Sequence, residues 1–159
     1  MGRDVMLLEQ MIRCKHYKFA KEAKDWREAI CISCQPLEAD GSVTAGYKEE
    51  IIQAVEQYGP YIVIMPNVAI PHAQEHSHHV KKTAVSFLKL EKPVCFTDGQ
   101  EKKYVQHFFT FASCNGNEHV ENVKSLVDLL LDEAFVNVLE QVACEQDFIQ
   151  LQQDWEGEF

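Results

Sequence analysis

The histidines are the residues of this sequence best suited to chemistry near neutral pH. An imidazole with a pKa of about 6.5 can act as a base, a nucleophile or a metal ligand. Five of the seven histidines fall in two places, with His72, His76, His78 and His79 in one short segment and His119 further along the chain. The first group would offer zinc ligands if His72, His76 and His79 shared one helical face. No cysteine or carboxylate with a typical zinc-ligand spacing accompanies them, so His76, His78 and His79 are interpreted as solvated loop residues.

His72 differs from the other histidines in its segment. It follows Pro71 directly after the short apolar stretch Val68-Ala69-Ile70, so a proline fixes the backbone from which its imidazole projects. Folds that alternate helices and strands often place reactive groups at strand ends. This position leaves both a structural and a catalytic role open. Because the sequence has no G-x-S-x-G nucleophile motif, a catalytic His72 would itself be the nucleophile.

The cysteines and glycines exclude several other kinds of chemistry. Cys31 and Cys34 form a C-x-x-C pair, but they fall in the middle of a predicted helix that begins near Asp25. Redox pairs of this type sit at a helix N-terminus, where the dipole lowers the thiol pKa, so two core thiols are predicted instead. The six cysteines are widely spread and predict no disulfide framework. No glycine-rich phosphate loop occurs, and we expect neither a cofactor nor a bound metal.

Composition sets the class of protein and its partners. The 159 residues, 46% of them hydrophobic, predict one domain over 1–159 with its own core. The net charge of -10 is the reverse of what nucleic acid or an anionic membrane would attract. The apolar runs are far shorter than the ~20 residues that cross a bilayer. Glu9 and Arg13 interrupt the apolar start, unlike in a secretory signal, so a cytoplasmic protein is expected.

Apolar spacing predicts helices at both ends of the chain. The first twenty residues have a helical pattern, and a capping box at Asp25 opens a second helix that runs toward Leu37. Thr44 is the expected N-cap of a third helix, which ends at Gly59-Pro60. After residue 117 the helical pattern returns over 120–130, 135–142 and 148–151.

Strands are predicted between these helices. Runs rich in β-branched and aromatic residues occur at 61–64, 68–70, 83–90 and 104–112. The last run is apolar on both faces, as in a central strand that is covered on both sides. We expect short links between strands near His72 and Pro93, which favour a mixed sheet over an all-parallel one. We therefore predict a single-domain α/β fold with a mixed β-sheet sandwiched between helices on both faces.

Two motifs give the chain a family resemblance. The segment 59–73, above all Val68-Ala69-Ile70-Pro71-His72, resembles the phosphorylation-site region of enzyme IIA of the sugar phosphotransferase system, in the ascorbate-type branch of the mannitol/fructose class. The segment from Asn115 to His119 resembles the Asn-Glu-His segment that holds the second active-site histidine of mannitol-type members. The resemblance covers about residues 24–150. It implies the mannitol-type enzyme IIA fold.

The resemblance also implies a phosphoryl relay. The phosphocarrier protein HPr would donate from its phosphohistidine, His72 would be the phosphoacceptor, and a cysteine of the IIB component would receive the group. His119 would support His72 by stabilising charge on the phosphoryl oxygens. The membrane component IIC would be an indirect partner, and the branch implies an ascorbate- or pentitol-like substrate for the whole system. Monomer and homodimer both stay open.

The sequence departs from the family pattern at positions that matter for binding an anion. Mannitol-type members carry an arginine on the helix before the strand, where this chain has Glu56 or Gln57. The ascorbate-type pattern has an arginine two places after its histidine, where this chain has Gln74, and a glycine where this chain has Asn67. This shortage of fixed positive charge leaves open an interaction module with a regulatory role and no role in transport. The histidines at 72–79 leave open a second alternative, a histidine-rich metal-binding protein.

Overall fold

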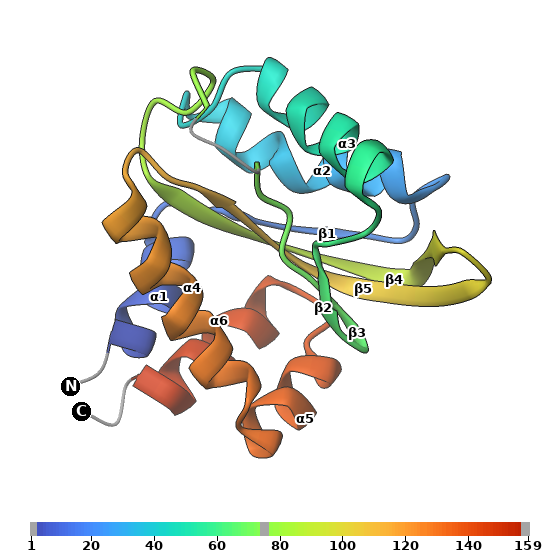
Figure 1. The fold of residues 1–159 in the computed structure, drawn as a ribbon. Helices are drawn as coiled ribbons and strands as arrows, with labels where there is room; N and C mark the ends of the chain where they lie inside the picture. Colours follow the sequence, from blue (N-terminus) through green and yellow to red (C-terminus); the bar gives the residue numbers. More distant parts are fainter. Residues whose placement is uncertain (1–2, 74–76, 157–159) are drawn as a thin grey trace.

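The computed structural model describes residues 3–73 and 77–156, which form six helices and five strands (Figure 1). In chain order these are α1 (Arg3–Arg13), β1 (Tyr17–Ala20), α2 (Trp26–Ala39), α3 (Gly46–Tyr58), β2 (Val63–Met65), β3 (Asn67–Ala69), β4 (Ala84–Asp98), β5 (Glu101–Ala112), α4 (Gly116–Leu130), α5 (Glu133–Gln141) and α6 (Glu145–Glu156). Across the described part of the chain, no helix combines the length and apolar character that a membrane crossing requires.

The five strands form one mixed sheet in the order β1-β4-β5-β3-β2. The pairs β1/β4 and β3/β5 are parallel, whereas β4/β5 and β2/β3 are antiparallel. The predicted mixed sheet is therefore confirmed. So is the prediction that 104–112 supplies the central strand, because β5 lies in the middle of the order.

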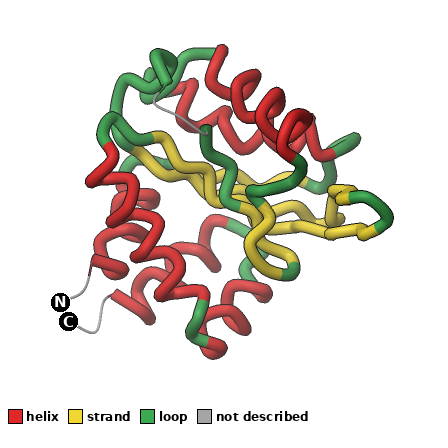
Figure 2. Tube along the Cα trace, in the orientation of Figure 1, coloured by secondary structure: helices red, strands yellow, loops and turns green. Residues whose placement is uncertain are grey.

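Helices cover both faces of this sheet, as predicted (Figure 2). Helices α2 and α3 pack on one face, and α1 with α4 to α6 packs on the other (Figure 1). The first face buries residues such as Ile30 and Ile51 in one apolar cluster, and the second buries Leu8, Leu126 and Phe148 in another. The sheet thus separates two cores, and its side chains alternate between them.

Helix α2 begins as its sequence predicts, whereas α3 does not. The Asp25 carboxylate accepts a hydrogen bond from the Glu28 amide at 2.9 Å, which satisfies one unpaired donor of the first turn. Thr44 is not the N-cap of α3: Ala45 holds that position and makes no side-chain capping bond. The Thr44 hydroxyl instead bonds to His79 Nδ1 at 2.5 Å.

Three expectations about strands and links were wrong. Strand β1 lies in a segment expected to be helical, because pairing with the long strand β4 stabilises four residues that are too short to show a period of their own. Pro93 is not in a link but inside β4, where the register shifts between Lys89 and Val94, and a proline is tolerated at such an irregularity. The link after His72 is long, since β4 begins only at Ala84.

Strand β3 begins at an unusual backbone position. Asn67 has φ of +70°, in the left-handed region that glycine favours and asparagine tolerates better than most residues. Its side chain is fixed by Gln106 on β5, whose amide N–H donates to Asn67 Oδ1 at 2.8 Å. In return, Asn67 Nδ2 donates to Gln106 Oε1 at 3.0 Å. The conformation explains why asparagine can stand where the family pattern has glycine.

Candidate functional site

The backbone before His72 is tied to the sheet. After β3 ends, the Ile70 amide donates to the carbonyl of Ile62 at 2.7 Å, and the Phe111 amide on β5 donates to the carbonyl of Pro71 at 2.9 Å. Ile70 is also buried. His72 therefore projects from a segment that continues the sheet for two residues beyond β3, as its position after a strand and a proline predicted.

The imidazole of His72 is held in one tautomer. Its Nδ1 lies 2.6 Å from the carbonyl oxygen of Ile70, and a carbonyl only accepts, so Nδ1 carries the hydrogen. Nε2 then has the lone pair. Burial lowers the pKa of His72, partly offset by the hydrogen bond to Ile70, which raises it. The ring is thus neutral near pH 7 and able to act as a nucleophile through Nε2.

His119 lies in the first turn of α4 and faces His72. Asn115 caps this helix by accepting a hydrogen bond from the Glu118 amide at 2.8 Å. The ring centroids of His72 and His119 are 5.7 Å apart. Ser113 Oγ lies 3.2 Å from Nδ1 of His119. Burial lowers the pKa of His119, and the nearby His72 lowers it further.

A cavity of about 270 Å³ opens between the two histidines. Its lining combines two imidazoles, hydroxyl groups, backbone at the start of α4 and a few apolar side chains: Tyr47, His72, Ala73, Ser77, Val80, Phe111, Ser113, Asn115, Gly116 and His119. No lysine or arginine is among these described lining residues. The pocket therefore offers hydrogen-bond donors and a helix N-terminus to an anion, rather than a fixed cation.

The positions that lack the family's arginines lie apart from this cavity or outside the described residues. Glu56 is on the surface, where its carboxylate pairs with Arg27 at 2.9 Å. Gln57 is exposed and does not line the cavity. Gln74 lies outside the described residues.

Of the remaining histidines of the 72–79 segment, the two that the structure describes do not share a helical face with His72. His78 and His79 lie in a turn, and His76 lies outside the described residues. His78 is exposed as predicted, but the prediction for His79 was wrong. Its ring is half-buried against α3, bonded to Thr44 and 3.5 Å from the Glu50 carboxylate. Gly46 allows this contact, because a Cβ there would lie 2.2 Å from the ring of His79.

The structure bears on two other sites considered from the sequence, a metal centre and a redox pair at Cys31 and Cys34. In the part of the chain that is described, no group of three or more His, Cys, Asp or Glu side chains is arranged to hold a metal ion. Cys31 and Cys34 lie inside α2 rather than at its start, as predicted. Burial raises the pKa of both thiols, that of Cys34 to about 12, which opposes thiolate chemistry.

Comparison with known proteins places the chain in a family. Residues 10–154 match the family model "Phosphoenolpyruvate-dependent sugar phosphotransferase system, EIIA 2". The chain is 33% identical over 146 residues to the ascorbate-specific PTS system EIIA component of Escherichia coli K12, covering 91% of this chain and 94% of that protein. The chain belongs to the EIIA 2 family. It is therefore a phosphotransferase component, as its two histidine motifs predicted.

Other relatives agree with this assignment. The EIIA chain is 35% identical over 131 residues to the ascorbate-specific EIIA component of Salmonella typhimurium LT2, covering 82% of this chain and 84% of that one. A crystal structure assigned as a PTS IIA domain of Streptococcus pyogenes M1 GAS superposes with a TM-score of 0.81 at 28% identity, over 93% of this chain and 94% of that one. The IIA mannitol structure of Escherichia coli shares the fold at 22% identity, with a TM-score of 0.71 over 87% and 96% of the two chains.

Three residues near His72 and His119 in this EIIA chain were not singled out from the sequence. Tyr47 has the spacing of a core residue in α3, and only its hydroxyl indicates a further role. Tyr61 stands in a predicted strand, although it lies just before β2 and packs edge-on against His72. Ser113 directly follows β5 and bonds to His119. A hydroxyl beside either histidine motif is the signal that could have found Tyr61 and Ser113.

Proposed function

We propose that this EIIA chain accepts a phosphoryl group from the phosphohistidine of HPr on Nε2 of His72 and passes it to a cysteine of a IIB component. One observation carries the proposal. Nδ1 donates its hydrogen bond to the Ile70 carbonyl, so Nε2 of a neutral imidazole has its lone pair beside His119 and the cavity. A neutral imidazole nitrogen is a competent nucleophile near pH 7.

In the first transfer, the Nε2 lone pair of His72 forms a bond to phosphorus. The bond from phosphorus to the donor's histidine nitrogen breaks, and its electron pair returns to that nitrogen. Nδ1 keeps its hydrogen, which the Ile70 carbonyl holds throughout. In the second transfer, a IIB thiolate forms a bond to phosphorus, the bond from phosphorus to Nε2 of His72 breaks, and its electron pair returns to Nε2. No ATP is needed, because the phosphohistidine keeps a high transfer potential.

The cavity supplies what a phosphoryl group needs in place of an arginine. The transition state of phosphoryl transfer is loose and in-line, so the protein mainly positions groups and stabilises charge on the equatorial oxygens. The Ser113 hydroxyl is hydrogen-bonded to Nδ1 of His119. Nε2 of His119 is therefore the proposed donor to a phosphoryl oxygen. The start of α4, at Asn115 and Gly116, lines the same cavity and adds its positive dipole end.

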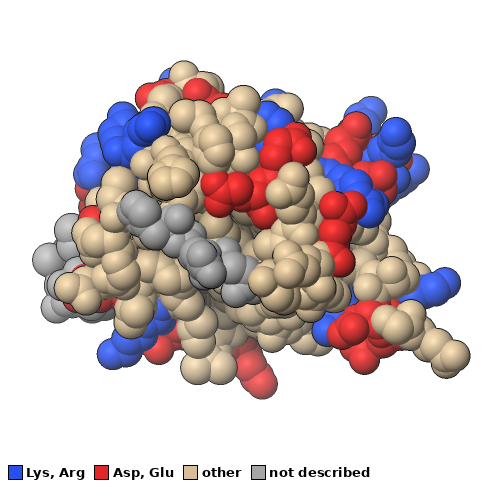
Figure 3. Space-filling model, turned by 45° about the horizontal axis from the view of Figure 1, so that its top comes forward, with Lys and Arg blue, Asp and Glu red and all other residues tan. Residues whose placement is uncertain are grey.

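Partner proteins are proposed to dock on an apolar groove beside the two histidines. Ile64, Ile70, Val123 and Leu131 line this groove together with His72 and His119, and Leu131 is 76% exposed. Asp and Glu side chains gather on the neighbouring face of α2 and α3, with Lys and Arg mainly toward its edges (Figure 3). An apolar centre with carboxylates nearby suits a protein partner that has a basic rim.

The system that this component serves is proposed to carry an ascorbate-like substrate. Support comes from relatives at 33% and 35% identity that are named as ascorbate-specific EIIA components. A IIB partner has a parallel in a solved complex of enzyme IIA and phosphorylated enzyme IIB of the mannitol system from Escherichia coli, whose IIA chain shares the fold at 22% identity.

The test is incubation with phosphoenolpyruvate, enzyme I and HPr, followed by intact mass measurement. The expected result is one acid-labile phosphate on the wild-type chain and none on His72→Ala. The His78→Ala variant is the matched control, since His78 is exposed and belongs to the same segment. Labelling of His72→Ala at the wild-type level would overturn the assignment of the phosphoacceptor.

A further inference from the structure

The peptide group between His72 and Ala73 is bonded at both its polar ends by tyrosine hydroxyls. Tyr61 Oη donates to the carbonyl oxygen of His72 at 2.5 Å. The amide N–H of Ala73 donates to Tyr47 Oη at 3.3 Å. Tyr47 Oη in turn donates its own hydrogen to the carbonyl of Phe111 on β5 at 2.5 Å. A hydroxyl has one hydrogen and can still accept, so all three bonds can exist together.

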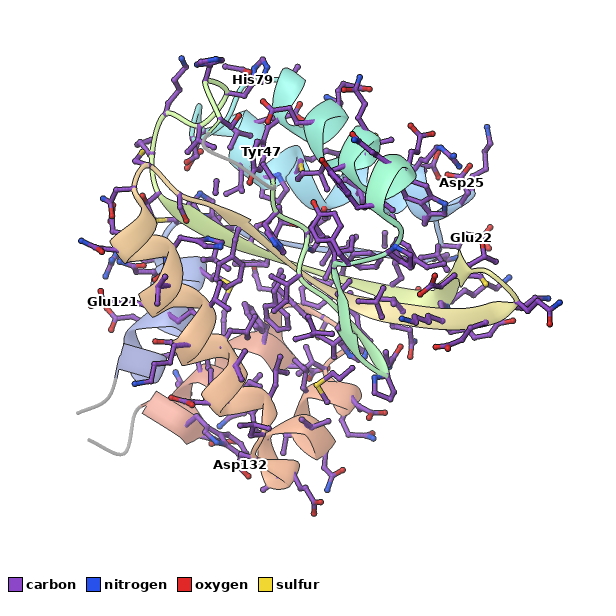
Figure 4. All side chains as sticks on the ribbon, in the orientation of Figure 1. Glu22, Asp25, Tyr47, His79, Glu121 and Asp132 are labelled. Carbon is purple, nitrogen blue, oxygen red and sulfur yellow. The ribbon has the colours of Figure 1, made fainter. Side chains whose placement is uncertain are left out.

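The two tyrosines approach this peptide group from different elements. Tyr47 lies in the first turn of α3, is 2% exposed, and sits between that helix and the segment after β3 (Figure 4). Tyr61 lies between the end of α3 and β2. Its ring also meets the His72 ring edge-on, with the centroids 5.1 Å apart and the planes at 90°. Tyr61 therefore contacts both the backbone and the imidazole of His72.

These contacts complete the fixation of His72. The residue before it is tied to β5 by the bond between the Phe111 amide and the Pro71 carbonyl, and its own ring is tied to Ile70. Without the tyrosines, the peptide group after His72 could rotate and carry the side chain with it. The two hydrogen bonds on this one peptide group oppose its rotation together.

We propose that Tyr47 and Tyr61 are positioning residues, which clamp the 72–73 peptide group and so hold the imidazole of His72 in line for phosphoryl transfer. The proposal rests on the proposed phosphoacceptor role of His72. Alignment matters because a misplacement of about 1 Å at a reacting group can reduce a rate about 100-fold. Burial raises the pKa of Tyr61 to about 12 and also raises that of Tyr47, so both hydroxyls keep their hydrogens near pH 7.

The clamp is tested with Tyr47→Phe and Tyr61→Phe, which keep the rings and remove the hydroxyls. We expect kcat for phosphorylation by phospho-HPr to fall about 10-fold in each variant, with KM changed less than about twofold, because alignment rather than docking is lost. The double variant should lose less than the product of the two effects, since both hydroxyls hold one peptide group. Tyr17→Phe is the matched control: its hydroxyl bonds to Glu145 on α6, and it should keep wild-type kcat.

Amide hydrogen exchange of Ala73, followed by NMR, tests the clamp without any phosphoryl transfer. We expect exchange to be about 5- to 10-fold faster in Tyr47→Phe, as loss of one hydrogen bond predicts, and unchanged in Tyr17→Phe. Failure of the wild type to take phosphate would contradict the proposed function, and the exchange rates would still test the clamp. Wild-type kcat in both single variants would overturn the positioning role, whatever the exchange rates. If Tyr47→Phe does not fold, the kcat of Tyr61→Phe decides alone, and a wild-type kcat in that variant would overturn the positioning role.

Discussion

Two histidines near opposite ends of strand β3 share the same local arrangement. His72 follows the end of the strand, and His107 on β5 lies against Asn67, where the strand begins. In each ring Nδ1 bonds to a backbone carbonyl, that of Ile70 at 2.6 Å and that of Asn67 at 3.2 Å. Burial lowers the pKa of both, that of His107 to about 4 with a further contribution from Lys89. Both imidazoles are neutral at pH 7.

The difference lies at the second nitrogen. Nε2 of His107 accepts a hydrogen bond from Lys89 Nζ at 2.8 Å, and His107 is only 1% exposed. The ring of His72 lines a cavity and faces another histidine. Strand position, tautomer and a low pKa therefore do not make a histidine reactive. A histidine becomes reactive when another molecule can reach Nε2, and this access depends on which side chains pack against the ring.

The largest difference between the two histidines is expected in phosphoryl transfer. His72→Gln should abolish phosphorylation by phospho-HPr, because no imidazole lone pair remains in the cavity. His107→Gln should be phosphorylated within about threefold of the wild-type rate, since Lys89 and the fold exclude a partner from that ring. Single-turnover labelling followed by intact mass measures both. Loss of labelling in a folded His107→Gln would show that the buried histidine also takes part in transfer.

The next largest effect is expected from removing the group that faces His72. His119→Ala should still accept phosphate on His72 but pass it to the cognate IIB component about 10²- to 10³-fold more slowly, as is typical when one donor to a transition-state oxyanion is lost. Rapid-quench measurement of transfer to IIB checks this. Transfer at the wild-type rate would show that His119 has no role in phosphoryl transfer beyond its place at the start of α4.

The pH dependence of labelling sharpens the comparison further. A protonated imidazole has no lone pair on Nε2, so phosphorylation should slow at acid pH. Because the pKa of His72 lies below 6.5, the rate should change less than about twofold between pH 8 and 6.5 and then fall toward tenfold per pH unit well below the pKa. Rates with saturating phospho-HPr, normalised to the donor's own pH profile, give the curve. A midpoint above 6.5 would contradict the burial argument.

The last expected effect is on the free energy of unfolding rather than on phosphoryl transfer, and it belongs to His107. Its pKa is about 4 in the folded chain and about 6.5 when unfolded, so the unfolded state binds more protons between these values. Stability should therefore fall as the pH drops from 6.5 to 4, by about 3 kcal/mol from this residue. Urea unfolding at pH 7, 5.5 and 4 measures it. His107→Gln should have a shallower slope, and an equal slope in both proteins would refute the assignment.

Asp40 contributes to the pH dependence of stability over a second, more acidic range. Burial alone would raise the pKa of this carboxyl, but hydrogen bonds from Ser42 and His16 outweigh it and lower the pKa to about 2. The stability that Asp40 contributes is thus present above pH 3.8 and lost between 3.8 and 2. Most of the decline expected from His107 falls above that range, between pH 6.5 and 4.

The sequence predicted the layered fold because long apolar patterns decide it. Helix α2 shows its start through Asp25, and β5 shows its central place through an apolar run on both faces. The four-residue strand β1 could not be predicted, since its stability comes from pairing with β4 rather than from its own pattern. Pro93 was misplaced because a proline marks a turn more often than an irregular strand position.

The site was predicted in part. Motifs indicated His72 and His119, and the fold brings these two rings to 5.7 Å from each other. The sequence did not indicate that Lys89 would seal His107, because that contact depends on the register of the β4/β5 pair. It did not indicate that His79 would pack on Gly46, because these residues belong to elements far apart in the chain. Nor did it indicate the tyrosine hydroxyls at the 72–73 peptide group, since Tyr47 and Tyr61 fit the patterns of core residues.

The most direct test of the difference between the two histidines is the identity of the nitrogen that carries phosphorus. After labelling by phospho-HPr, two-dimensional NMR of the 15N-labelled chain resolves the ring nitrogens of each histidine, and one-bond coupling to 31P identifies the phosphorylated atom. We predict coupling at Nε2 of His72 alone, with Nδ1 still protonated and the His107 signals unchanged. Coupling at Nδ1 of His72, or at any other histidine, would contradict the proposal that the Ile70 carbonyl selects the reacting nitrogen.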